Sequence, residues 1–85
     1  MIKDNLPLIY GIIEAFMLLE NCGPDEVNPD TAVRGMEHIA SALLKLEASD
    51  QIALRKELEH IAAKARDNTY RDFVRALPDS IGLAT

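Results

Sequence analysis

The stretch NPDTAVRGMEHIASALLK (Asn28–Lys45) carries the clearest helix signal in the chain. Asn28 is suited to cap free backbone N–H groups, Pro29 loses no hydrogen bond at the first helical position, and Asp30 opposes the positive end of the helix dipole. Apolar residues then recur with helical spacing, and we expect the face they form to be buried. That face consists of Ala32, Val33, Met36, Ile39, Ala40, Leu43 and Leu44. These signals predict a helix that begins at Asn28-Pro29.

The same helical spacing extends upstream of this stretch. Residues from about Asn5 to Asn21 form a predicted first helix, in which Pro7 suits the first turn. Gly23-Pro24 is expected to end it, because glycine adopts the left-handed cap and proline cannot continue the helix.

Two more helices are predicted downstream. Ser49 or Asp50 is suited to cap a third helix that runs to about Arg66. The short connection before it predicts that the second and third helices are antiparallel neighbours. A short fourth helix follows Asp67-Asn68 and is expected to end at Pro78.

These patterns predict an all-α fold, a small helical bundle of three main helices plus a short C-terminal fourth helix. A length of 85 residues is typical of one domain, so we expect a single helical domain over residues 1–85. Apolar residues make up 48% and charged residues 27%, which is typical of folded globular proteins rather than disordered chains. Ile81 and Leu83 follow the fourth helix, and we expect this tail to fold back over the bundle.

The first helix has more apolar surface than one buried face requires. Leu8, Ile12, Phe16 and Leu19 form one stripe. A second stripe of Tyr10, Ile13 and Met17 lies on the far side. Small chains often bury surplus apolar surface between subunits, so we predict a homodimer or partner interface at the second stripe. The alternative is a central helix covered on both sides by its own chain.

Charge is distributed unevenly along the chain. The formal net charge is -5, and residues 1–30, with Lys3 as their one base, account for all of it. We interpret the acidic residues Glu20, Asp25, Glu26 and Asp30 as a patch that attracts a basic protein partner. The alternative is that they only improve solubility and stabilise a helix start. An acidic chain is not expected to bind nucleic acid or an anionic membrane surface.

No residue pattern indicates catalysis or a cofactor. His38 and His60 lie about opposite the apolar faces of their helices, so we expect both to be exposed rather than to bind metal. Cys22 follows a helix C-terminus among acidic residues, which disfavours a reactive thiolate. The sequence therefore predicts no cofactor, no metal and no enzyme activity.

Two families of small acidic helical proteins invite comparison. Asp79-Ser80-Ile81 resembles the Asp-Ser-Leu attachment site of acyl carrier proteins, but their serine opens the second helix, whereas only five residues follow Ser80. Colicin-type immunity proteins, which block a basic toxin, are similar in size, charge and helix number. This similarity implies a type of function and no family assignment.

The remaining expectations concern location and function. The apolar run Leu8–Leu19 has twelve residues and contains Glu14, so it is too short to span a membrane, and we expect a cytoplasmic protein. The leading hypothesis is a non-catalytic protein-protein interaction module, such as a small acidic immunity or inhibitor protein. The alternative is a structural homodimeric subunit or scaffold.

Overall fold

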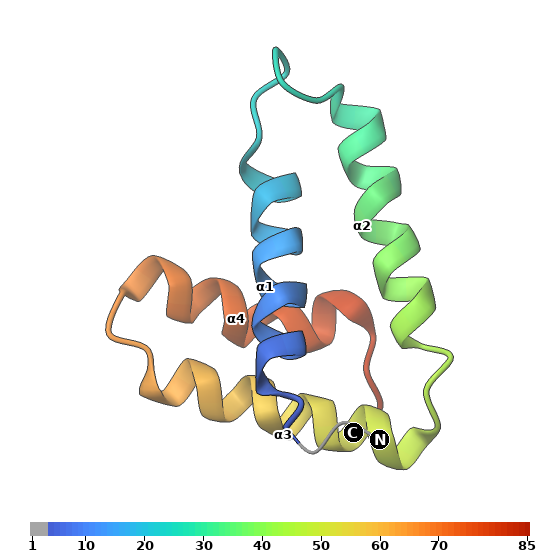
Figure 1. Cartoon of the computed structure of the whole chain (residues 1–85), viewed down its shortest axis with the longest axis vertical. Helices are drawn as coiled ribbons and strands as arrows, with labels where there is room; N and C mark the ends of the chain where they lie inside the picture. Colours follow the sequence, from blue (N-terminus) through green and yellow to red (C-terminus); the bar gives the residue numbers. More distant parts are fainter. Residues whose placement is uncertain (1–3) are drawn as a thin grey trace. The chain divides into compact units, whose positions relative to one another are not determined.

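The computed structural model describes residues 4–85, and within that range the fold is all-α, as predicted. The helices are α1 (Leu6–Asn21), α2 (Pro29–Leu43), α3 (Ala48–Lys64) and α4 (Asn68–Ile81) (Figure 1). No strand occurs in the described part of the chain. The prediction of a short fourth helix was wrong, because α4 has 14 residues and α2 has 15.

The chain divides into two compact units. The first ends at Glu37 and contains α1, the connecting turn and the first part of α2. The second runs from His38 to Thr85 and contains the end of α2 together with α3 and α4. The single domain expected from the length of the chain stays a prediction. Among residues 4–85, no helix combines the length and apolar content needed to cross a bilayer.

Helix starts in the first unit follow local side-chain capping. The Asn28 Oδ1 atom accepts a hydrogen bond of 2.9 Å from the Asp30 N–H, and α2 begins at Pro29 as predicted. At α1, the Leu6 N–H donates to Asp4 Oδ1 at 3.0 Å. Both helices therefore begin where a side-chain oxygen satisfies one of the N–H groups that the first turn leaves free.

The apolar face of α2 is much less buried than expected. Of its seven apolar residues, Ala32 alone is buried, while Val33 and Leu44 are 49% and 41% exposed. The predicted burial of the whole face was wrong, because helical spacing shows which residues share a face and not whether another element covers it.

In the second unit, α3 and α4 pack against each other (Figure 1). The prediction that the second and third helices are antiparallel neighbours stays a prediction. Apolar side chains along α3 and α4 are buried, with Leu58 at 1% and Val74 at 0% exposure. Leu83, in the predicted tail, is buried at 3% exposure, whereas Ile81, at 5% exposure, is the last residue of α4 and not part of a tail.

The end of α4 differs from the prediction. Pro78 lies inside the helix, which continues to Ile81. A proline in this position removes one backbone hydrogen bond, but Pro78 is itself buried and its carbonyl accepts bonds of 3.0 Å from the N–H groups of Gly82 and Leu83. Gly82, at φ +90°, adopts the left-handed conformation that ends the helix.

Arg55 of α3 holds the chain that follows α4. Its guanidinium donates to the carbonyl of Leu83 at 2.7 Å, to the carbonyl of Ala84 at 3.1 Å and to Asp79 Oδ1 at 3.0 Å. The Arg55 side chain is 16% exposed, whereas that of Asp79 is 84% exposed. The two backbone bonds therefore lie in the more protected surroundings.

Gln51, one helical turn before Arg55, completes this anchor. Its Oε1 atom accepts a 3.1 Å bond from the Ala84 N–H. Its Nε2 group donates to the carbonyls of Leu44 and Leu46 at 3.1 and 2.9 Å, in the connection before α3. We call the bonds from Gln51 and Arg55 to residues 83 and 84 the C-terminal clasp.

Candidate protein-binding site

The turn between α1 and α2 is held by its own backbone. The N–H groups of Glu26 and Val27 donate to the Gly23 carbonyl at 2.9 and 3.1 Å. At the end of α1, the Cys22 N–H donates to the Leu18 carbonyl at 2.9 Å. These bonds fold the connection into a tight turn within the first unit, followed directly by the Asn28 cap of α2.

The structure places the four acidic residues of the predicted patch around this turn. Glu20 lies in the last turn of α1, Asp25 and Glu26 lie on the connection, and Asp30 lies in the first turn of α2. All four are exposed. The two ion pairs found within residues 4–85 involve other residues, and Lys3 lies outside the described residues. We refer to these four residues as the acidic turn.

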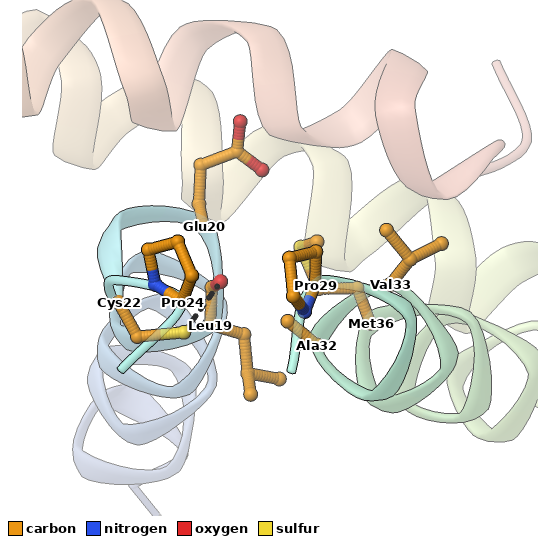
Figure 2. Close-up of a pocket in the computed structure, with 8 residues that line it drawn as sticks. All are labelled: Leu19, Glu20, Cys22, Pro24, Pro29, Ala32, Val33 and Met36. Atoms are coloured by element: carbon orange, nitrogen blue, oxygen red, sulfur yellow. Dashed lines mark hydrogen bonds between the residues drawn. The ribbon is translucent and has the colours of Figure 1, made fainter. Parts of the chain in front are cut away.

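A pocket of about 260 Å³ lies beside the acidic turn, within the first unit (Figure 2). Its lining comes from the end of α1, the connection and the start of α2. The lining residues are Leu19, Glu20, Cys22, Pro24, Pro29, Ala32, Val33 and Met36. Glu20 is the one charged residue among them, so the acidic turn and the apolar pocket are contiguous.

A close approach between α1 and α2 positions one wall of this pocket. A Cβ atom added at Gly35 would lie 3.1 Å from Leu19 Cδ1, which is tighter than ordinary van der Waals contact. The absence of a side chain at Gly35 therefore leaves room for Leu19. The Cys22 thiol is engaged locally, because its Sγ donates to the Leu19 carbonyl at 3.3 Å (Figure 2).

The residues predicted to form an interface on α1 occupy different surroundings. Tyr10 is 45% exposed and Met17 is partly buried, whereas Ile13 is 0% exposed. Ile13 belongs to the buried stripe together with Ile9 and Phe16, so its side chain is not available to a second protein. The expected division of α1 into two stripes therefore needs correction at Ile13.

Other apolar residues of α1 are exposed, including Leu8 of the first predicted stripe. Leu18 is 66% exposed, and Leu8 and Leu6 are 53% and 40% exposed. No sequence signal distinguished them, because α1 is apolar on almost every side and its periodicity does not select the face that is covered.

The remaining polar candidates do not form a metal-binding cluster in the described chain. His38 and His60 are both exposed, as the helical phase predicted. Within residues 4–85, no group of three or more His, Cys, Asp or Glu side chains is placed to hold a metal ion. Ser80 lies in the last turn of α4 and donates to the Ala76 carbonyl at 3.0 Å, unlike a serine that opens a helix.

Comparisons with protein-family models, with curated proteins and with solved structures find no match to this chain. Its functional assignment therefore rests on the chemistry of the acidic turn, the adjacent pocket and the exposed residues of α1.

Proposed function

We propose that this chain is a non-catalytic protein-binding module that engages a basic partner protein, in the manner of small acidic immunity or inhibitor proteins. The observation that carries the proposal is the acidic turn, in which four exposed carboxylates lie next to an apolar pocket. Arg34, one helical turn after Asp30 on α2, is the one Lys or Arg in the described residues 4–37 of the first unit, so the acids of this unit outnumber its bases.

The physical role of such a patch is to accelerate and orient encounter. Clustered charge of one sign raises association rates with an oppositely charged partner by roughly 10- to 1,000-fold, and this effect weakens as salt is added. Apolar contact at the centre of an interface then slows dissociation, because it removes surface from water. The first unit presents both features at one end.

Charge reversal tests the proposal. The tagged protein is used to capture partners from a lysate of the producing cells at low and high salt, and the captured proteins are identified by mass spectrometry. We expect basic proteins whose capture is lost with the double variant Asp25→Lys, Glu26→Lys. The matched control is Glu57→Lys, Glu59→Lys on α3, which alters two exposed acids and the net charge equally.

The comparison between these two variants decides the result. Capture that falls with the turn variant and persists with the α3 variant supports a specific acidic turn. Equal loss of capture with both variants would show that capture depends on the net charge of the protein and not on the acidic turn. Unchanged capture with both variants would show that the acidic turn does not contribute to binding.

A second candidate function is a structural homodimer that assembles through α1. What favours it is the exposure of large apolar side chains on that helix, above all Leu18 at 66% and Tyr10 at 45%. Met17, which the sequence pattern groups with Tyr10, is partly buried. Surplus apolar surface on a small chain is commonly buried between subunits.

Light scattering over a concentration series tests this candidate. A dimer that dissociates with Leu18→Lys, and not with Ala63→Lys on the exposed surface of α3, would support assembly through α1. A monomer at every concentration, or a dimer that survives Leu18→Lys and Met17→Lys, would reject it.

A further inference from the structure

We infer that the pocket beside the acidic turn receives one large apolar side chain, of the size of Phe or Leu, from a segment of the partner that also carries Lys or Arg. The inference rests on the proposed function and specifies the chemistry of the partner. It also separates two contributions, because the pocket would select the apolar side chain and the acidic turn would select its basic neighbours.

The size of the pocket favours a side chain over a whole small molecule. Pockets for drug-sized ligands usually measure roughly 300–1,000 Å³, and this one measures about 260 Å³. Such a space is large enough for the end of one or two side chains. Its lining is a shallow wall rather than a closed cavity, because Val33, which forms part of it, is still 49% exposed.

The lining chemistry favours an apolar occupant. The lining includes the aliphatic and thioether side chains of Leu19, Val33 and Met36 and the rings of Pro24 and Pro29. Contact with these groups would remove apolar surface from water on both partners. Glu20 is the charged residue in the lining, so a cation next to the apolar group is better accommodated than an anion.

The acidic turn specifies the charge of the segment that carries this side chain. Asp25 directly follows the lining residue Pro24, and Asp30 directly follows Pro29. With Glu20 in the lining itself, carboxylates therefore flank the pocket on each contributing segment. Arg34, which directly follows the lining residue Val33, is the one base on these segments, so a basic segment would meet complementary charge over the acidic turn itself.

Charge also argues against a second copy of this chain as the occupant. The protein carries a formal net charge of -5, and any copy that docked its own turn region here would bring like charges together. Juxtaposed like charges oppose association. The exposed apolar face of α1 is a separate surface for self-association, and the pocket is assigned to a basic partner.

The experiment uses two capped peptides of equal charge, Lys-Lys-Phe-Lys-Lys and Lys-Lys-Ser-Lys-Lys, titrated into the isotope-labelled full chain. Binding is followed through amide chemical shifts. We expect the Phe peptide to bind about tenfold or more tightly than the Ser peptide, because the difference reports burial of one aromatic side chain. Its largest shifts should fall on residues 19–36.

Two variants of the pocket sharpen the assignment. Ala32→Leu places a larger side chain in the lining of the pocket. Val33→Ser removes an apolar side chain from the lining at a position that is already 49% exposed, so this variant creates no buried cavity. Both are expected to reduce the preference for the Phe peptide. Ala42→Leu, at an exposed position of the same helix, is the matched control and should retain the preference.

The outcomes distinguish this inference from the proposed function. Equal binding of both peptides, or shifts centred outside residues 19–36, would overturn the pocket assignment. If that equal binding were still weakened by Asp25→Lys, Glu26→Lys, the acidic turn would survive as a binding surface without the pocket. A Phe preference that persists in Ala32→Leu and Val33→Ser would also overturn the inference.

Discussion

Replacement of Arg55 by alanine is expected to destabilise the second unit by about 2–4 kcal/mol. The Arg55 guanidinium makes two bonds to backbone carbonyls, those of Leu83 at 2.7 Å and Ala84 at 3.1 Å, from a side chain that is 16% exposed. Hydrogen bonds to a charged group contribute roughly 1.5–3 kcal/mol each. Two such bonds would sum to about 3–6 kcal/mol, and the expected loss is smaller because water can hydrate the two freed carbonyls once the side chain is removed.

The ion pair with Asp79 contributes little to this total. The Asp79 side chain is 84% exposed, and exposed pairs contribute about 0–1 kcal/mol. Asp79→Asn is therefore expected to lower the free energy of unfolding by less than about 1 kcal/mol. Arg55→Lys should fall between the two, because an ammonium keeps the charge and cannot reproduce the planar three-way geometry.

Urea denaturation followed by circular dichroism measures these differences, and hydrogen exchange at the Ala84 amide measures the clasp directly. The expected order of destabilisation is Arg55→Ala, then Arg55→Lys, then Asp79→Asn. If Asp79→Asn were as damaging as Arg55→Ala, the ion pair rather than the backbone bonds would hold the chain end. A loss below about 1 kcal/mol for Arg55→Ala would show that the clasp adds no stability beyond an exposed pair.

Two further predictions concern the ends of α4. Gly82→Ala should reduce stability by about 1 kcal/mol through its φ of +90° alone, since an added Cβ meets nothing within 4 Å, and D-alanine at this position should restore the stability in thermal unfolding. Asp67→Ala should cost about 1 kcal/mol by removing the 3.0 Å bond that Asp67 Oδ1 accepts from the Tyr70 N–H, whereas Asp67→Asn should retain most of it. Accelerated exchange of the Tyr70 amide in Asp67→Ala alone would support this, and equal exchange in all three proteins would contradict it.

The starts of the helices show where local sequence signals suffice. Asn28 and Pro29 act on backbone groups within one turn, and α2 begins where they predict. The start of α3 was expected at Ser49 or Asp50, but the helix begins at Ala48 without a side-chain cap. The preceding connection is held instead by Gln51, which reaches back to carbonyls five and seven residues earlier, and capping preferences do not describe such a contact.

The covered faces were harder to predict than the helices. On α1 the buried stripe contains Ile9 and Ile13, whereas the expected stripe contained Leu8 and Ile12. Because almost every side of α1 is apolar, the free energy gained by burying apolar surface is similar for adjacent faces of this helix. A face of such a helix is selected by the shape of what covers it, which sequence periodicity does not contain.

The candidate site was predictable in its charges and not in its shape. The acidic residues are close in the sequence, so a turn between two helices necessarily brings them to one end. The pocket depends on side-chain packing between helices, such as the approach of Leu19 to the bare backbone of Gly35. That geometry arises only when α1 and α2 are placed side by side in the first unit.

The C-terminal clasp also makes the chain end useful for spectroscopy. Ala84 is held through both its N–H and its carbonyl, and Thr85 next to it is exposed. A fluorophore coupled at Thr85 would therefore be attached next to a residue whose backbone is held in place. Its anisotropy decay should therefore follow the rotational tumbling of the second unit, and the Arg55→Ala variant should add a fast component as the dye is released.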